Sequence, residues 1–241
     1  MAKKRIVVLG SRELAVQLTF WMLEQPNVEV IGCVIPDYKG GEKDPFYLWV
    51  RSRGLPEYPV DALAELRPDL AFSLNYWRAI PEHLIDAVPG GIVNIHHSYR
   101  LRYKGRNTCS WAIMKAREDD VWYHGTTLHY IDKELDKGRI IATEKCPITE
   151  EDTAFTLFGK VEQLAADLFR RKFADILAGQ DGAAEQEDET SYFFDAKQRP
   201  DIPEETAAAL YDYARAWSFP GKPAPVIEFN GHKIRLQIDS E

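Results

Sequence analysis

Short apolar runs alternate with amphipathic segments through the first hundred residues, and this alternation restricts the possible folds more than any other feature. Glu13–Glu24 carries apolar residues at helical spacing, and Val60–Glu65 is a shorter helix candidate. Strands that alternate with helices typically form a parallel sheet with helices on its faces. The sequence therefore predicts an α/β fold with strands at Arg5–Leu9, Val28–Ile35, Leu70–Leu74 and Ile92–Ile95.

The middle of the chain continues this pattern. Thr126–Ile131 and Arg139–Cys146 have the composition of strands, and an acidic loop connects them. Thr153–Leu177 repeats apolar residues at helical spacing, and Asp152 precedes it as a candidate cap. We expect this long helix to have a structural role.

The composition changes after Gly179 to an acidic, weakly hydrophobic stretch, which indicates a connector at 180–190. Residues 191–241 predict a small C-terminal appendage of helix and hairpin, which would be marginally stable alone. We expect it to pack on the main domain or on a second subunit, so the sequence favours a homodimer. Its predicted elements are a strand at Tyr192–Phe194, a helix at Pro203–Ala216, and a hairpin of Val226–Phe229 with Lys233–Gln237 turned at Asn230-Gly231.

Composition and charge exclude several classes of protein. The chain has 241 residues, of which 45% are hydrophobic, and this is enough for a core. The N-terminal apolar run is too short for a signal peptide and no run reaches membrane-spanning length, so we expect a cytoplasmic protein without a membrane partner. Three unclustered cysteines indicate neither a disulfide framework nor a cysteine metal site. A net charge of −8 argues against nucleic acid as the main partner.

Asn94 and His96 form the first candidate site. Side chains repeat every second residue along a strand, so these two should point to the same side of the strand that ends there. An amide NH2 can donate to a developing oxyanion, an imidazole can exchange protons near neutral pH, and a carboxylate such as that of Asp136 can orient the imidazole. A histidine at a strand end can equally be a hydrogen-bonded structural residue, and Asp136 a turn residue.

A wider set of motifs resembles the folate-dependent formyltransferases, and the resemblance runs in order from Arg5 to about Gly179. It implies a Rossmann-like catalytic domain over 1–179, N10-formyltetrahydrofolate as the formyl donor, and Asn94, His96 and Asp136 as the catalytic residues. The chain departs from the usual family pattern at Ser98–Leu101. The motifs are Asn94–Ser98, Tyr103–Asn107, Trp111–Ile113, His124–His129 and Leu135–Ile141.

The same resemblance suggests residues for binding the folate. The family segment that holds the pterin ring matches 76–81 here, so its wall would be formed by Tyr76, Trp77, Arg78 and Ile80. These residues could instead cap the sheet, with Arg78 on the surface. Asp132 is assigned to the folate side and is also the alternative to Asp136 as the catalytic carboxylate.

Two segments are candidates for binding the acceptor. The turn with Ser11 and Arg12 follows the first strand, although a plain strand-to-helix turn fits as well. No acidic residue occurs from position 89 to 117, and Arg102, Lys104 and Arg106 in this stretch could hold a diphosphate. A solvated basic loop is the alternative. The histidines at 124 and 129 do not match a helical metal-binding motif, so we expect no catalytic metal.

Three classes of function are compared. The protein could formylate an amino sugar linked to a nucleotide, it could formylate a different amine, or it could be a non-catalytic module that only binds folate or a nucleotide. Arg215–Pro220 is similar to a segment that follows the catalytic domain in sugar and methionyl-tRNA formyltransferases. The methionyl-tRNA enzyme normally has a longer basic C-terminal domain, and the glycinamide ribonucleotide enzyme ends soon after its long helix. The resemblance therefore favours a dTDP- or GDP-linked 4-amino-4,6-dideoxyhexose destined for the lipopolysaccharide O-antigen; a peptide amine also stays open.

Overall fold

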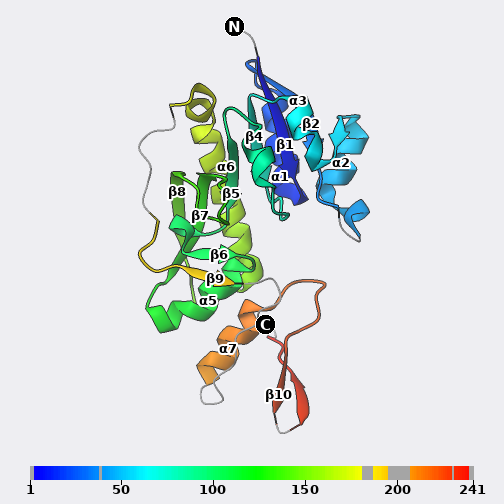
Figure 1. Cartoon of the computed structure of the whole chain (residues 1–241). Coiled ribbons are helices and arrows are strands. Elements are labelled where there is room, and N and C mark those ends of the chain that lie inside the picture. Colours follow the sequence, from blue (N-terminus) through cyan, green and yellow to red (C-terminus); the bar gives the residue numbers. More distant parts are fainter. Residues whose placement is uncertain (1–2, 38–39, 181–186, 195–206, 230, 239–241) are drawn as a thin grey trace. The chain divides into compact units, whose positions relative to one another are not determined.

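The computed structural model describes residues 3–37, 40–180, 187–194, 207–229 and 231–238 (Figure 1). Contacts divide the chain into two compact units that are both discontinuous in sequence. The first unit holds 1–96, 127–143 and 166–187, and the second holds 97–126, 144–165 and 188–241. The successive domains at 1–179 and 191–241 stay a prediction, and the connector at 180–190 lies largely outside the described residues.

A seven-stranded sheet forms the centre of the fold, in the order β3-β2-β1-β4-β5-β7-β8. The first five strands along this order are parallel, and β7 pairs antiparallel with β5. The predicted α/β class is confirmed, with an antiparallel strand added beside β5. The strands are β1 (Lys4–Gly10), β2 (Val28–Val34), β3 (Glu57–Tyr58), β4 (Leu70–Leu74), β5 (Ile92–His96), β7 (Tyr123–Tyr130) and β8 (Ile140–Pro147).

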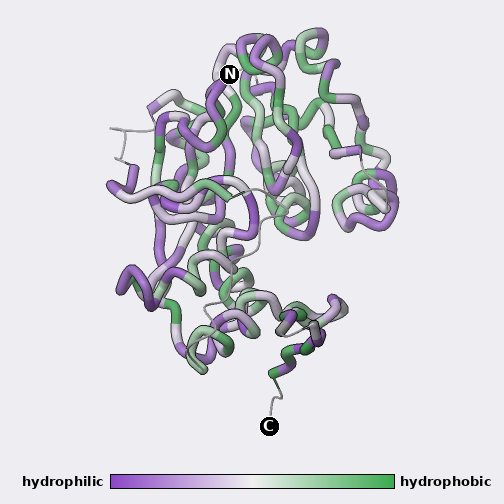
Figure 2. Tube along the Cα trace, turned by 60° about the horizontal axis from the view of Figure 1, so that its bottom comes forward, coloured by the Kyte–Doolittle hydropathy of each residue, from purple (hydrophilic) through white to green (hydrophobic). Residues whose placement is uncertain are grey.

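Burial explains why these apolar runs become strands. Ile6–Leu9 in β1 and Ala71–Phe72 in β4 are fully buried, as expected for central strands of a parallel sheet that is covered on both faces. Figure 2 shows runs of hydrophobic colour interspersed with hydrophilic ones along the trace, with both colours mixed along the coiled segments. The helices that accompany this sheet are α1 (Arg12–Leu23), α2 (Pro45–Arg53), α3 (Leu63–Leu66) and α4 (Glu82–Ile85), with short 3-10 turns η1 (Gly41–Lys43) and η2 (Val60–Ala62).

An aromatic cluster attaches the C-terminal half of α6 (Ala154–Ala178) to the first unit. The rings of Phe72 and Phe169 meet edge to face at 4.9 Å, and those of Trp21 and Phe173 at 5.0 Å. Such pairs add to the stabilisation from buried area. The helical periodicity read from the sequence is thereby confirmed for this segment.

The second unit has its own core around α5 (Thr108–Asp119). Trp111 stacks on Phe194 with ring centroids 3.7 Å apart, and Phe194 belongs to β9 (Tyr192–Phe194), which pairs parallel with β6 (Tyr103–Gly105). The unit also contains η3 (Tyr99–Leu101), the start of α6, α7 (Ala207–Ala216), β10 (Val226–Phe229) and β11 (His232–Arg235). Four residues of the predicted helix, 203–206, and Asn230 of the predicted turn lie outside the described residues.

Arg215 fixes α7 to the turn before α6. Its buried guanidinium donates to the carbonyl oxygens of Thr149 and Asp152 at 3.0 and 2.7 Å, and to the Asp212 carboxylate at 2.9 Å. A buried charge needs partners of this kind to offset its lost hydration. This contact gives a structural reason for an arginine at the start of the Arg215–Pro220 segment.

The cap of α6 differs from the prediction. Thr153 and Thr156 form a reciprocal pair, because each side-chain oxygen accepts from the backbone N–H of the other at 3.2 and 3.0 Å. Asp152 instead accepts from the backbone N–H and hydroxyl of Thr149, from the hydroxyl of Thr156 and from Lys160 Nζ. Its carboxylate therefore stabilises the turn before the helix and does not cap the helix. No helix within the described ranges is both long enough and apolar enough to cross a membrane.

Candidate functional site

The pairing of β5 with β7 brings the polar residues of the two strands together. In this antiparallel register Asn94 lies opposite His129, and His96 lies opposite Thr127. Opposite residues on neighbouring strands have their side chains on the same face. The sequence could place Asn94 and His96 on one face, but it could not provide the register that adds His129.

A short chain of polar contacts starts at Asn94. Its side-chain nitrogen lies 3.0 Å from Nε2 of His129, and Nδ1 of His129 lies 2.9 Å from the carbonyl oxygen of Tyr130. His129 is 2% exposed. Both imidazole nitrogens therefore have polar partners inside the sheet.

His96 and Asp136 form the second pair of the site. Nδ1 of His96 lies 3.6 Å from Oδ1 of Asp136, and the two side chains are 10% and 9% exposed. The contact is longer than a direct hydrogen bond, as is common in catalytic sites before a substrate binds. The first unit thus brings all three predicted catalytic side chains to the strand pair and the loop that follows it.

The loop between β7 and β8 has the backbone geometry that its sequence requires. Asp136 has a φ of +51°, a left-handed conformation that aspartate adopts more readily than most residues. A Cβ added at Gly138 would lie 1.6 Å from the carbonyl oxygen of Tyr130, so only glycine fits there.

Asp132 is exposed and accepts from the backbone N–H of Lys133 at 2.6 Å. Of the two carboxylates weighed for the site, the one beside His96 is therefore Asp136.

Ser11 and Arg12 form the turn between β1 and α1. The Ser11 hydroxyl is buried and donates to the carbonyl oxygen of Asn75 at 2.7 Å. The backbone N–H of Arg12 donates to the Asp44 carboxylate, which also accepts from two N–H groups in the first turn of α2. Ser11 therefore has a structural partner, whereas the Arg12 side chain is exposed.

The predicted folate wall lies after β4. Tyr76 and Ile80 are partly buried and pack against a core cluster that includes Val7 and Leu84. Arg78 lies over the Trp77 ring at 4.6 Å and donates to the carbonyl oxygen of Asp37. Burial, with a smaller contribution from Asp61, raises the pKa of the Tyr76 hydroxyl against the opposing effect of Arg78. These contacts fit both readings of the segment, as a ligand wall and as a cap on the sheet.

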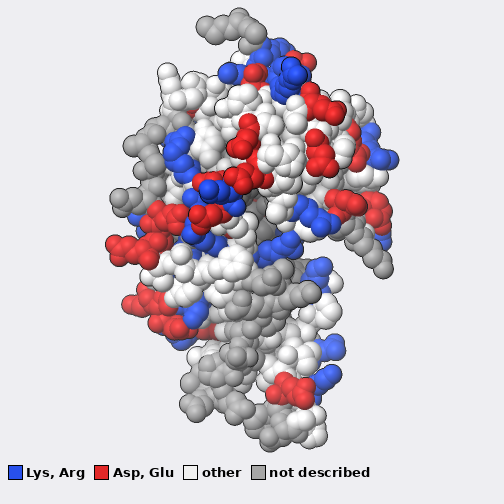
Figure 3. Space-filling model, in the orientation of Figure 1, with Lys and Arg blue, Asp and Glu red and all other residues white. Residues whose placement is uncertain are grey.

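The basic segment is less exposed than its charge indicated. Arg102 is 7% exposed and pairs with Asp119 at 2.9 Å and with Asp188 at 2.8 Å. Lys104 is 6% exposed, whereas Arg106 is exposed. The Arg102 guanidinium is thus balanced by two carboxylates that are distant in sequence, and a diphosphate role for this segment stays a prediction. On the face drawn in Figure 3, acidic and basic side chains are interspersed.

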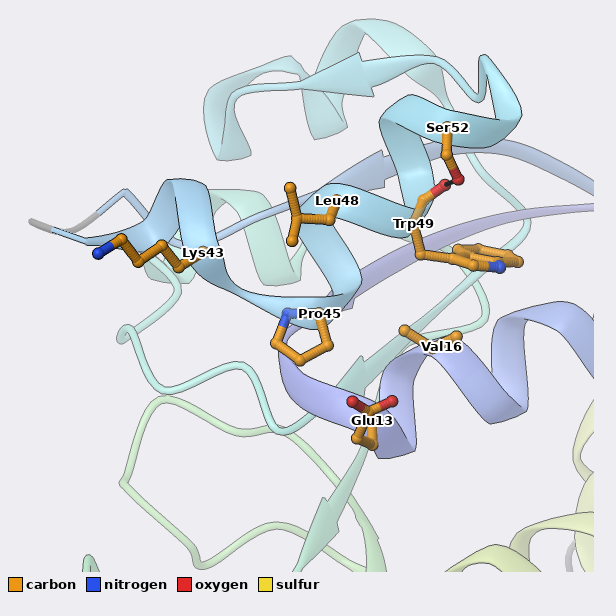
Figure 4. Close-up of a pocket in the computed structure, with 7 residues that line it drawn as sticks. All are labelled: Glu13, Val16, Lys43, Pro45, Leu48, Trp49 and Ser52. Carbon is orange, nitrogen blue, oxygen red and sulfur yellow. Dashed lines mark hydrogen bonds between the residues drawn. The ribbon is translucent and has the colours of Figure 1, made fainter. Parts of the chain in front are cut away.

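Concavity alone does not identify the site. A hollow between α1 and α2 is lined by Glu13, Val16, Pro45, Leu48 and Trp49, among others (Figure 4). It is open to solvent, and none of the candidate residues lines it. Within the part of the chain that the structure describes, no three His, Cys, Asp or Glu residues are arranged to hold a metal ion.

Comparisons with known proteins place this geometry in context. Residues 5–172 match the family described as formyl transferase. The methionyl-tRNA formyltransferase of Pediococcus pentosaceus is 28% identical over 205 residues, covering 79% of this chain; the chain spans only 63% of that relative's length.

Solved structures are similar over nearly the whole chain. A 4-N formyltransferase from Francisella tularensis is 19% identical with a TM-score of 0.78, covering 99% of this chain and 98% of that one. An N-formyltransferase from Helicobacter canadensis, solved with folinic acid and dTDP-3-aminofucose, is 18% identical with a TM-score of 0.73, covering 99% and 97%. At these identities the likeness shows the fold.

Proposed function

Because this chain belongs to the formyl transferase family, we propose that it transfers a formyl group from N10-formyltetrahydrofolate to the amine of a nucleotide-linked amino sugar. The observation that carries the proposal is the site on β5, β7 and their following loop, where Asn94, His96 and Asp136 come together. These three side chains supply an oxyanion donor, a proton-transfer group and a carboxylate to orient it.

The residues would act on the reaction as follows. The neutral amine attacks the formyl carbon, a new C–N bond forms, and the bond from that carbon to N10 of the folate breaks. Asn94 and protonated His96 stabilise the negative charge that develops on the formyl oxygen. Asp136 holds His96 and helps to take the proton that the amine loses, while N10 gains one. No covalent intermediate with the protein is required.

A folate donor and a sugar acceptor are supported by several observations. The likeness to the sugar N-formyltransferase folds extends through the C-terminal region, and the Helicobacter canadensis enzyme was solved with folinic acid and a dTDP-linked amino sugar. We assign the folate to the segment with Tyr76, Trp77, Arg78 and Ile80, with Asp132 beside it. A dTDP- or GDP-linked 4-amino-4,6-dideoxyhexose for the O-antigen is the proposed acceptor.

The diphosphate of this acceptor needs cationic partners. We propose Lys104 and Arg106 for this role, together with Arg12, because charge-assisted contacts to phosphate are strong and directional. Arg102 already pairs with the carboxylates of Asp119 and Asp188. A homodimer working in the cytoplasm stays part of the proposal, and light scattering of the purified protein tests the dimer.

Methionyl-tRNA is the second candidate acceptor, and the 28% identity to the Pediococcus pentosaceus enzyme favours it. The net charge of −8 opposes it, since binding to a polyanion draws on a basic surface. Both acceptors are anionic, but a tRNA carries far more charge and requires a much larger basic surface than a single diphosphate.

Incubation of the purified protein with N10-formyltetrahydrofolate and a panel of dTDP-, GDP- and UDP-linked amino sugars tests the proposal directly. We expect mass spectrometry to detect addition of one formyl group to a sugar, and Asn94→Ala to slow this addition on the order of 100-fold or more. Charged methionyl-tRNA is included in the same panel. Formylation of the tRNA and of no sugar would replace the acceptor, and formylation of neither would overturn the proposed reaction.

A further inference from the structure

His129 lies in a position from which it can control Asn94. It occupies the residue opposite Asn94 in the β5–β7 register, is 2% exposed, and contacts the Asn94 side-chain nitrogen at 3.0 Å. Its ring also meets that of His96 edge to face at 6.2 Å. The proposed reaction takes place on Asn94, His96 and Asp136, and His129 performs no chemical step in it.

The contact with Tyr130 determines which imidazole nitrogen carries the proton. A backbone carbonyl oxygen can only accept, so Nδ1 of His129, 2.9 Å from the Tyr130 oxygen, must be the N–H donor. In the neutral ring Nε2 then has a lone pair and acts as an acceptor. The Asn94 NH2 group is the donor that meets it.

This arrangement fixes the orientation of the Asn94 amide. Rotation of the amide by half a turn would place its oxygen against the Nε2 lone pair, which is unfavourable. One N–H of the Asn94 amide donates to Nε2 of His129. Because the amide group is planar, this contact also sets the direction of its second N–H. The oxygen and the NH2 group of an amide are nearly equal in size, so a packed pocket alone does not distinguish them.

We propose that His129 is a positioning residue, which holds Asn94 with its second N–H directed to the formyl oxygen during transfer. The inference rests on the proposed function and adds a residue to it. A misoriented amide would present an acceptor to a developing negative charge, so the donor must be aligned before the reaction begins. His129 acts on the reaction through Asn94 and does not itself contact the substrate.

The tautomer of His129 is measured on the unmodified protein. Long-range 1H–15N NMR correlations of the imidazole, assigned by comparison with His129→Gln, should show a protonated Nδ1 and an unprotonated Nε2. The opposite tautomer would overturn the inference, because Nε2 could then not accept from Asn94.

Two variants of similar size separate positioning from packing. His129→Leu removes the acceptor, and we expect kcat to fall on the order of 10-fold with the KM values of both substrates little changed. His129→Gln keeps a side-chain oxygen that can accept from Asn94, and it should recover most of that loss. Equal losses in both variants would indicate packing and overturn the inference.

A double-mutant cycle tests whether His129 acts through Asn94. If it does, the Asn94→Ala/His129→Leu variant is no slower than Asn94→Ala alone, whereas independent effects multiply. Multiplied losses would overturn the inference. Full activity of Asn94→Ala would be a different failure, because it would remove the proposed role of Asn94 and with it the proposed function.

Discussion

Nδ1 of His96 lies 3.6 Å from Oδ1 of Asp136, with both side chains about nine-tenths buried, so the loop after β7 supplies a carboxylate to the ring at the end of β5. We expect Asp136→Asn to reduce kcat on the order of 100-fold, because the amide has no negative charge to stabilise a protonated imidazole and cannot take the proton that the amine loses. Asp132→Asn is the matched control in the same loop, and its exposed carboxylate contacts the adjacent backbone. Steady-state kinetics on both variants check this, and a larger loss in Asp132→Asn would reverse the assignment.

Asn94→Ala and His96→Ala should each lower turnover on the order of 100-fold or more while the protein stays folded. The physical reason is the loss of an oxyanion donor in one case and of a proton-transfer group in the other. Turnover and circular dichroism are measured on the same preparations. Near-normal turnover in either folded variant would contradict its proposed role.

The three basic residues at 102, 104 and 106 should give different results. Arg106→Ala and Lys104→Ala are expected to raise KM for the nucleotide sugar by about 10-fold, with little change for the folate. Raising the salt concentration should weaken sugar binding in the wild type more than folate binding. Equal effects on the two substrates would remove the diphosphate role.

Arg102→Ala should act on stability instead. Its removal leaves the carboxylates of Asp119 and Asp188, each 14% exposed, without their shared cation. Breaking such a pair costs about 3 kcal/mol in free energy of unfolding. Urea denaturation measures it, with Arg106→Ala as the control that should unfold like the wild type. An unchanged midpoint for Arg102→Ala would show that the pair is not stabilising.

Asp152 makes stability depend on pH. Burial opposes ionisation of this carboxyl, but hydrogen bonds from Lys160, Thr149 and Thr156 outweigh it and hold its pKa below the ordinary value of 3.8. A lowered pKa contributes stability above the unfolded value, and this is lost as the pH falls through the folded value. Asp152→Asn should therefore be destabilised by about 1 to 2 kcal/mol at neutral pH. In thermal unfolding the gap from wild type should close as the pH drops below 3.8; a constant gap would mean that ionisation is not involved.

Most strands and α1 could be predicted because their signal lies in consecutive residues, as in the helical spacing of apolar residues over Glu13–Glu24. The short strands β3 and β6 could not be predicted in this way. Helix α5 could not be predicted in this way, because all six residues of Thr108–Ile113 are buried and the segment has no amphipathic stripe. Helix α2 was also not predicted, although Asp44 before Pro45 is a recognisable start signal. The missed partners of Arg102 are long-range, since Asp188 lies 86 residues away in sequence.

The site could be predicted in part for the same reason. Alternation placed Asn94 and His96 on one side of a strand, and the resemblance supplied Asp136. His129 was visible as a residue of the next strand, but its partner depends on the register of β5 against β7. Register is set by packing over many residues and is not encoded at any single position.

That register gives the Asn94–His129 pair a part in folding fidelity. If β7 slipped by one residue, Leu128 or Tyr130 would replace His129 opposite Asn94, and the imidazole would move to the other face of the sheet. The half-buried amide and the buried ring would then each lose this partner, and an unsatisfied buried polar group costs about 1 to 3 kcal/mol. The two residues therefore penalise misaligned strand pairing during assembly of the sheet, so a chain that has paired these strands incorrectly is driven to realign them.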